Sequence, residues 1–318
     1  MYKESPFQTI SFLDLYEGLK KIKPFRIELE VNNQCVAYSN LIVFDSSPFL
    51  RYAVIYDNPV YTTESELLLL IQEIINKCRQ YSCIFLELRL SQPDAVFKAN
   101  WESSGFSSKP WYNAILSLDT ALPRRISASK KRNVEASIRL GYIQKECSSS
   151  NELWEAYCIL KGHYKRINKP LPEYKFFDNI FQAMQQNRKG LPKNSATILI
   201  SLLNQRVIST SVVLLSANTA SQFYFASTKL PGLLHPGSFH QWSMIEWAAA
   251  NEYQWIDLVG GGDPRFEYGV REFKRRFGAN FTDCGRYTYV FKPIQFRVLW
   301  TLRDFLDKFK RSLGAYSS

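Results

Sequence analysis

The chain has 318 residues and a mass of 36.9 kDa, and its 40 lysines and arginines exceed its 29 aspartates and glutamates, which gives a formal charge of +11. This length predicts two domains. The hydrophobic content of 46% is enough for real cores, so it excludes a disordered or fibrous chain. The basic balance favours polyanionic partners, such as nucleic acid, phosphorylated ligands or an anionic membrane, although a solvated basic surface has the same charge.

Targeting signals and metal-binding patterns are missing from the sequence. The N-terminal segment MYKESPFQTI lacks the basic-then-apolar pattern of a secretory leader, and no apolar run approaches the ~18 residues that a membrane-spanning helix needs. The cysteines form no CxxC pair, and with three histidines they form no zinc-binding cluster. The six cysteines are Cys35, Cys78, Cys83, Cys147, Cys158 and Cys284. We expect reduced thiols, no metal and a cytoplasmic location.

Strands and helices alternate in the first third of the chain. Alternating apolar residues predict the strands, and helical spacing of apolar residues predicts the helices. Thr63 and Glu66 have the spacing of a helix start. The expected strands are 25–31, 36–44, 51–55, 83–90 and 112–118, and the expected helices are 66–80 and 95–103.

The pattern breaks at Asp119–Pro123 and then restarts with a basic helix that Gly141 ends. The expected helices are 127–140, 152–167, 174–187, 238–251 and 266–277, and the expected strands are 142–147, 196–203, 206–215, 222–226, 255–259 and 287–291. The turn Asn204-Gln205 joins two of these strands into a hairpin. Because both halves share one order of elements, we expect two α/β domains, residues 1–122 and 123–318, with the strand 287–291 closing the second sheet.

The signatures of common hydrolases, zinc proteases and P-loop enzymes (GxSxG, HExxH and GxxxxGK[ST]) are absent. The segment 230–242 (LPGLLHPGSFHQW) joins a strand to a helix start, where backbone N–H groups can bind an anion. Gly237 and Ser238 are therefore candidate phosphate ligands, although Pro236-Gly237-Ser238 can equally start an ordinary helix. His235 and His240 flank this point, and His240 is either a proton acceptor or a packing residue.

The segment 253–279 (YQWIDLVGGGDPRFEYGVREFKRRFGA) places Asp257 in a strand and Lys274 in a later helix. Asp257 is either a buried, hydrogen-bonded acid at the strand end or a base. Lys274 is either a surface lysine or a cation presented to a developing oxyanion beside Phe273. The glycines 260–262 lack the GxGxxG spacing of a dinucleotide site.

Two basic segments concentrate the positive charge. Seven basic residues and a single acid lie between Arg124 and Lys145, and a second group spans Arg271–Arg276. Lys130, Lys131 and Arg132 are the candidate phosphate contacts of the first segment.

The segment 125–141 (RISASKKRNVEASIRLG) resembles the opening of the second domain in the Fem family of peptidoglycan aminoacyltransferases, and the stretch from LLHPGSFHQW to REFKRRFGA resembles its C-terminal part. The resemblance implies two tandem GNAT-like domains, each with a mixed, mostly antiparallel sheet flanked by helices. It also implies acyl transfer to an amine of a phosphorylated cell-envelope precursor, peptidoglycan or amino sugar.

In the family, the Phe-Lys pair lies beside the acyl ester, which implies catalytic roles for Phe273 and Lys274, with His240 or Asp257 as proton acceptor. Lys130, Lys131, Arg132, Gly237, Ser238 and Tyr224 are the implied substrate-binding residues. The donor is a co-substrate, aminoacyl-tRNA or acyl-CoA, and no cofactor is permanently bound. The chain lacks both the family's coiled-coil insertion and, around 232–237, the Q/R-x-x-G-x-G/A pyrophosphate signature of CoA-binding GNAT proteins, so both donors stay open.

Residues 294–313 carry an apolar stripe with basic residues opposite. Such a helix either packs on its own domain or lies on the inner face of an anionic membrane, which would suit a lipid-linked acceptor. The alternative to an enzyme is a non-catalytic protein that binds RNA or anionic lipid on the same tandem scaffold.

Overall fold

The computed structural model describes residues 5–47, 49–93, 95–187, 196–230 and 235–301. The chain forms two compact units, each built on a mixed sheet. Unit 1 comprises Met1–Lys20, Leu90–Pro93 and Pro110–Gly285. Unit 2 comprises Lys21–Arg89, Asp94–Lys109 and Arg286–Ser318.

This division differs from the expected domains 1–122 and 123–318, because two strands enter the sheet of the other half of the chain. β7 (Tyr112–Ser117) pairs with β12 and β13 in unit 1. β14 (Arg286–Val290) pairs with β5 and β6 in unit 2, so the expectation that it closes the second sheet is wrong. Apolar alternation shows that a segment is a strand, but it does not show which sheet the strand joins.

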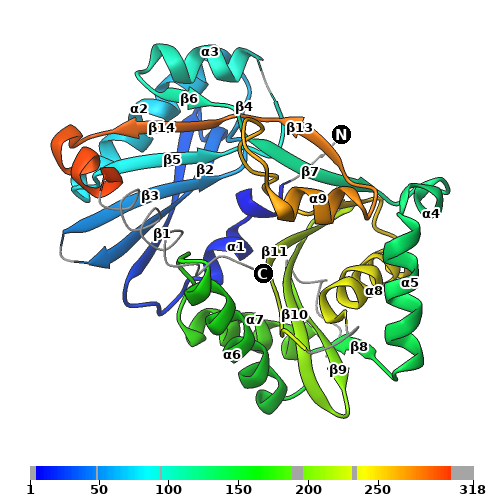
Figure 1. Ribbon diagram of the computed structural model, residues 1–318. Helices are drawn as coiled ribbons and strands as arrows, with labels where there is room; N and C mark the ends of the chain where they lie inside the picture. Colours follow the sequence, from blue (N-terminus) through cyan, green and yellow to red (C-terminus); the bar gives the residue numbers. More distant parts are fainter. Residues whose placement is uncertain (1–4, 48, 94, 188–195, 231–234, 302–318) are drawn as a thin grey trace. The chain divides into compact units, whose positions relative to one another are not determined.

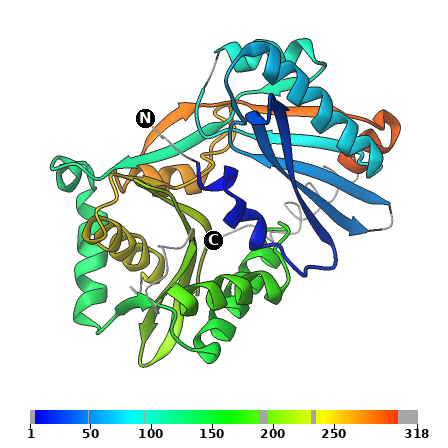
Figure 2. The same ribbon diagram turned by 180° about the vertical axis from the view of Figure 1, so that it is seen from behind.

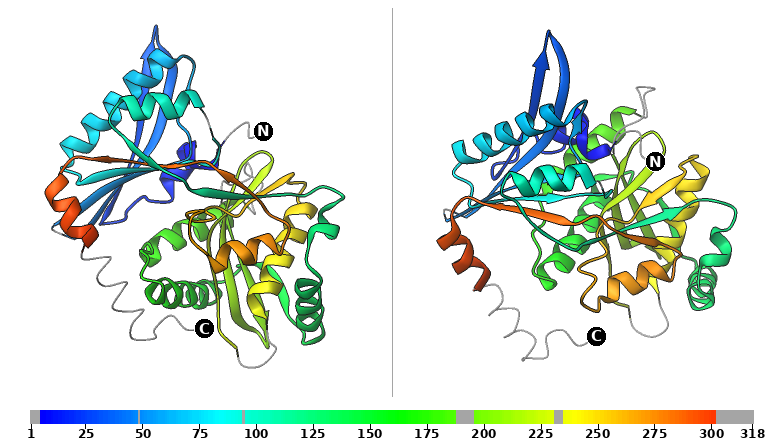
Figure 3. Two further views of the ribbon diagram at one scale, coloured as in Figure 1. Left: turned by 45° about the horizontal axis from the view of Figure 1, so that its top comes forward. Right: turned by 90° about the horizontal axis from the view of Figure 1, so that it is seen from above.

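In unit 2 the described strands have the order β1-β2-β3-β5-β14-β6, and β4 pairs with β2. The strands are β1 (Ile22–Val31), β2 (Gln34–Ser47), β3 (Leu50–Tyr56), β4 (Val60–Tyr61), β5 (Phe85–Arg89) and β6 (Ser107–Lys109). The helices α2 (Glu64–Gln80) and α3 (Ala95–Ser103) lie along one face of this sheet (Figure 3). Thr63 and Glu66 form the expected capping box at the start of α2.

In unit 1 the described strands have the order β13-β7-β12-β11-β10-β9-β8. The strands are β8 (Ile143–Glu146), β9 (Ala196–Leu203), β10 (Arg206–Leu215), β11 (Thr219–Ser227), β12 (Trp255–Asp257) and β13 (Asn280–Asp283). The helices are α5 (Ala128–Arg139), α6 (Ser150–Arg166), α7 (Tyr174–Asn187), α8 (Pro236–Ala250) and α9 (Gly269–Arg275), with the short η1 (Pro6–Gln8), α1 (Ile10–Asp14) and α4 (Leu122–Arg125). Helices α5 and α8 lie on one side of the sheet, and α6 and α7 lie on the other (Figures 1 and 2).

The predicted fold class is confirmed. Each sheet is mostly antiparallel and contains one parallel pair, β3 with β5 in unit 2 and β11 with β12 in unit 1. Helices flank both sheets, as in an α/β protein of two mixed sheets.

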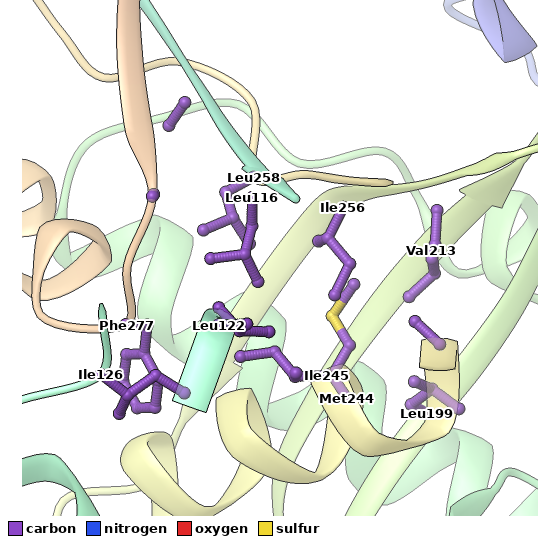
Figure 4. Packing of buried hydrophobic residues seen from close by; sticks show 14 residues of the cluster. Leu116, Leu122, Ile126, Leu199, Val213, Met244, Ile245, Ile256, Leu258 and Phe277 are labelled. Atoms are coloured by element: carbon purple, nitrogen blue, oxygen red, sulfur yellow. The ribbon is translucent and has the colours of Figure 1, made fainter. Parts of the chain in front are cut away.

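Helix α8 is fixed to the sheet of unit 1 by a buried apolar cluster (Figure 4). Met244 and Ile245 on α8 pack in the same cluster as Ile256 of β12 and Val213 of β10. Phe277, which follows α9, is fully buried in it. This core therefore holds the second half of α8 and the end of α9 on one side of the sheet.

Two expectations reach past the described residues. Residues 293–301 are helical, and the rest of the apolar stripe, 302–313, lies outside the described part of the chain. Residues 232–234 of the loop before Gly237 lie outside it as well. Among the described helices, none is both long and apolar enough to cross a membrane.

The β9–β10 hairpin offers a test of the turn. Asn204 and Gln205 both have left-handed backbones, with φ of 49° and 63°. Glutamine rarely adopts this conformation, whereas glycine does so without steric cost. We expect Gln205→Gly to raise the free energy of unfolding by roughly 0.5–1 kcal/mol in urea titrations. Asn204→Gly is the control and should change the free energy of unfolding little, because asparagine tolerates the left-handed conformation. An equal gain in stability from both variants would contradict a steric cost specific to Gln205.

Candidate functional site

Helix α8 begins where two strands of unit 1 separate. β11 and β12 pair in parallel only over Thr219–Ser221, and β11 then continues to Ser227. The start of α8 lies against this extension, because a Cβ on Gly237 would approach Ser227 Oγ to 3.1 Å and Phe225 Cζ to 3.5 Å. A Cβ at this position would require the Ser227 side chain to shift by a few tenths of an ångström, so glycine suits the close approach of the helix start to β11.

Lys130 on α5 meets this helix start. Its Nζ donates to Ser238 Oγ at 3.0 Å and lies 4.3 Å from the ring centroid of Phe273. The Phe273 ring in turn stacks with Phe225 at 6.4 Å between centroids. We call Lys130, Gly237, Ser238 and Phe273 the Lys130 cluster. The structure thus brings together four of the residues singled out in the sequence, from three different helices.

The electrostatics of the Lys130 cluster favour an added anion. Burial lowers the pKa of Lys130, and the nearby Arg276 lowers it further. Within the described residues, no carboxylate forms an ion pair with Lys130. Since the ammonium has three N–H groups and Ser238 accepts one, two remain for a ligand.

Lys131 and Arg132 extend this positive charge along α5. Lys131 is half-buried and Arg132 is exposed. The first turn of α5 contains no acidic residue. Cations near a helix N-terminus are repelled by the helix dipole and by one another. An anion bound there would offset both repulsions.

Lys274 occupies a different position from the one expected for an oxyanion ligand. It is 9% exposed, and its Nζ donates to the carbonyls of Leu258 at 2.6 Å and of Val259 and Gly260 at 2.9 Å each. Burial lowers its pKa to about 7, while the Asp257 carboxylate acts in the opposite direction. Three carbonyls accept all three N–H groups, so Lys274 fixes the turn that follows β12.

This turn is strained. Val259 has a φ of 56°, a conformation that is unfavourable for a β-branched residue. Asp257 is 2% exposed, and its Oδ1 accepts from the Val259 amide at 2.7 Å. Asp257 is therefore the buried, hydrogen-bonded acid at the strand end, and with Lys274 it holds Val259 in place.

The glycines of the turn serve close packing. A Cβ on Gly261 would lie 2.8 Å from Phe281 Cδ1 and 2.9 Å from Tyr112 Cβ. Gly262 has a φ of 79°, which favours glycine. These contacts account for Gly261 and Gly262 without a bound nucleotide.

His240 lies in the protein interior. It is fully buried, and its Nδ1 and Nε2 lie 2.8 Å from Ser201 Oγ and Ser211 Oγ. Burial lowers its pKa to about 3. The ring is thus a neutral, doubly hydrogen-bonded packing residue, one of the two roles that the sequence allowed.

Tyr224 lies apart from the Lys130 cluster. Strand residues alternate between faces, so Tyr224 and Phe225 point to opposite sides of β11. Tyr224 packs against Phe176 and Phe177 of α7, with ring centroids 6.0 Å away in both cases. The structure does not bring Tyr224 to the start of α8.

Arg271 also shapes the site, although no sequence pattern singled it out for that role. Arg271 is 8% exposed, and it donates to the carbonyls of Gly261 at 2.9 Å, Asp263 at 2.5 Å and Phe266 at 3.0 Å. Its spacing of three residues from Lys274 puts both cations on one side of α9. This spacing, in a helix that follows a glycine turn, is the sequence pattern that could have identified Arg271.

The described residues contain no group of three or more metal-ligating side chains. The Lys130 cluster instead combines an ammonium with a hydroxyl at a helix start, a chemistry that suits an anion.

Residues 126–275 match the model of the acetyltransferase (GNAT) domain, and this segment contains the whole Lys130 cluster. No curated protein matches the chain significantly by sequence. The match supports the prediction that the chain is an acyltransferase enzyme.

Three solved structures share the fold. The crystal structure of FemX has a TM-score of 0.67 at 12% identity, covering 92% of this chain and 94% of that one. A tandem GNAT protein from the clavulanic acid biosynthesis pathway has a TM-score of 0.58 at 12% identity, and the match covers 86% of this chain and 84% of that one. The C-terminal domain of a putative lysylphosphatidylglycerol synthetase from Agrobacterium fabrum has a TM-score of 0.56 at 12% identity, and the match covers 82% of this chain and 84% of that one. The chain thus has a tandem GNAT-like, Fem-like fold.

The role of Lys274 can be tested by stability. We expect Lys274→Met to lower the free energy of unfolding by on the order of 3 kcal/mol, because three buried carbonyls lose their donor. The matched control is Arg275→Gln, the next residue on α9, which is exposed and should change stability by less than about 0.5 kcal/mol. Denaturant unfolding at pH 7 measures both. A Lys274→Met protein as stable as the control would contradict the positioning role.

The burial of His240 predicts a pH dependence. The folded-state pKa is about 3, below the unfolded value near 6.5, so the unfolded chain binds the extra proton between these values. Stability is therefore fully present above pH 6.5 and falls as the pH drops toward 3. We expect His240→Gln to unfold with a shallower pH dependence than His235→Gln over pH 7 to 4.5. Equal slopes in the two variants would contradict a neutral, buried His240.

Proposed function

We propose that the protein transfers an acyl or aminoacyl group from acyl-CoA or aminoacyl-tRNA to an amine of a cell-envelope precursor. The observation that carries this proposal is the Lys130 cluster, where an ammonium with two unused N–H groups lies on an aromatic ring at a helix start. The matched acetyltransferase domain contains it. The resemblance to the Fem family, and the name of the putative lysylphosphatidylglycerol synthetase that shares the fold, support an acceptor of the cell envelope.

Both donors carry phosphates and an activated carbonyl. In the proposed step, the acceptor nitrogen attacks the ester or thioester carbonyl carbon and forms the amide bond. The carbon–oxygen or carbon–sulfur bond breaks, and the amine proton passes to the leaving oxygen or sulfur, directly or through water. His240 is too deeply buried to take this proton.

Lys130, Ser238 and the amide of Gly237 supply positive charge and donors for the donor's phosphates or for the developing oxyanion. Lys131 and Arg132 extend this charge for a long polyanion. Phe273 forms the apolar side of the cluster, and Lys274 holds the neighbouring turn. The described part of the segment 294–313 packs on its own unit, because the rings of Phe296 and Trp300 lie 5.4 Å and 6.4 Å from the ring of Phe85 between centroids.

Donor binding tests the proposal. We expect Lys130→Gln to weaken binding of the functional donor about tenfold, because one charge-assisted contact is lost. Arg139→Gln on the same helix removes the same charge away from the cluster and is the control. The titration uses acetyl-CoA, aminoacyl-tRNA and uncharged tRNA, each followed by a search for amide product with an amino-sugar or peptidoglycan precursor.

The result also separates the two function classes. Saturable acetyl-CoA binding or a preference for charged over uncharged tRNA, with product, supports acyl transfer. Equal, salt-steep binding of charged and uncharged tRNA without product would favour the non-catalytic polyanion-binding protein. Equal donor affinities of Lys130→Gln and Arg139→Gln would remove the Lys130 cluster from either function.

A further inference from the structure

Two cysteines lie together at one end of α2 in unit 2. Cys78 is in the last turn of α2, and Cys83 lies just before β5. Both side chains are fully buried, and both are free thiols that the acyl-transfer proposal does not use. Only a short turn separates the end of the helix from Cys83, so the placement of the two thiols depends on the geometry of this turn.

The turn is a Schellman motif. The Cys83 amide donates to the Cys78 carbonyl at 3.0 Å. The Ser82 amide donates to the Arg79 carbonyl at 2.8 Å, and Ser82 has a left-handed φ of 53°. In this motif the side chains of the two residues joined by the longer hydrogen bond commonly contact each other. With standard bond lengths, this hydrogen bond keeps the two α-carbons within ~7 Å, close to the range that disulfides span.

The two thiols interact, and they are not equivalent. The hydrogen bond from Cys78 lowers the pKa of the Cys83 thiol. Arg51 and Lys292 lower this pKa further, and together these effects outweigh burial, which raises it. The same hydrogen bond and burial raise the pKa of Cys78. Since the thiolate is the nucleophile, Cys83 is the attacking group and Cys78 is the thiol that completes a bond.

The buried Cys83 lies beside a segment that solvent reaches. Ser82 is exposed and Tyr81 is half-buried, and α2 ends at Gln80. Helix ends open locally at a lower cost in free energy than a core does. The pairing of β5 begins only at Phe85, so opening of this turn uncovers the Cys83 sulfur while the strand stays paired.

We propose that Cys78 and Cys83 are a redox pair, which a low-molecular-weight disulfide converts reversibly into a disulfide bond. This bond would join the last turn of α2 to the segment that leads into β5. The proposal is independent of acyl transfer, because its test detects a covalent bond and measures no activity.

The reaction consists of two thiol–disulfide exchanges. The Cys83 thiolate attacks one sulfur of glutathione disulfide, the sulfur–sulfur bond of the oxidant breaks, and one glutathione leaves as thiolate. The Cys78 thiol then passes its proton to water or to that thiolate and attacks the Cys83 sulfur, and the second glutathione leaves. The protein thiols lose two electrons and two protons in total, and glutathione disulfide takes up the electrons.

The test incubates the folded, full-length protein with glutathione disulfide, blocks the remaining thiols with iodoacetamide and digests the denatured protein with trypsin without reductant. Trypsin cleaves after Arg79, so Cys78 and Cys83 fall on different peptides. We expect mass spectrometry to find the peptides 78–79 and 80–89 joined by a disulfide, and dithiothreitol to separate them.

Cys78→Ser removes the second thiol of the pair. Cys83 then has no neighbour to displace the first glutathione, so we expect a mixed disulfide of Cys83 with glutathione in place of the linked peptides. Cys35→Ser on β2 removes an exposed thiol of the same unit and is the control that should leave the linked peptides unchanged. If Cys78→Ser fails to fold, as judged by thermal unfolding before oxidation, Cys78→Ala replaces it with the same expected adduct. The result on the unaltered protein is decisive without either variant.

Linked peptides from the folded protein, released by dithiothreitol, support the redox pair. Three results would overturn it. The first is alkylation of both thiols after the oxidation step, the second is a mixed disulfide at Cys83 of the unaltered protein without the link, and the third is a link that forms only when urea is present during oxidation.

Discussion

The geometry of unit 1 depends on how one buried ammonium is satisfied. Lys274 donates to three consecutive carbonyls, and this is possible only because the backbone turns sharply at Val259. A left-handed valine is unfavourable, so the contacts with Lys274 and Asp257 must offset that strain. The interaction joins the end of β12 to α9, and it thereby determines where Phe273 lies.

This arrangement separates the two members of the Phe-Lys pair. Successive helical residues point about 100° apart, so Phe273 faces Phe225 and Lys130 while Lys274 faces the glycine turn. Arg271 reinforces the same turn through three further carbonyls. Lys130 comes from a different helix and reaches Phe273 across the start of α8, where its ammonium donates to the Ser238 hydroxyl and to no backbone carbonyl in the described part of the chain.

Local patterns in the sequence predicted local structure well. The bounds of α3 and α7, the capping box of α2 and the hairpin at Asn204 all follow from spacing and turn chemistry over a few residues. Lys130, Gly237, Ser238 and Phe273 had each been singled out, but no sequence pattern placed the four residues together. The exchange of β7 and β14 between sheets was not predictable in this way, since strand pairing depends on contacts far apart in the chain. The role of Lys274 could not be predicted either. The direction of the three carbonyls depends on the left-handed φ of Val259, and a valine in the sequence does not indicate a left-handed backbone.

The net charge of +11 conceals two kinds of cation. Lys274 and Arg271 are buried against backbone carbonyls, so their charges organise a turn. Lys130 is instead partly buried and placed near Arg276, and both effects disfavour its charge and so raise the free energy of the folded protein. Stability alone does not explain this placement, because a neutral residue at position 130 would relieve both effects. An anionic ligand would offset them as well, and that is the physical reason to seek a ligand at the start of α8 before any other part of the basic surface.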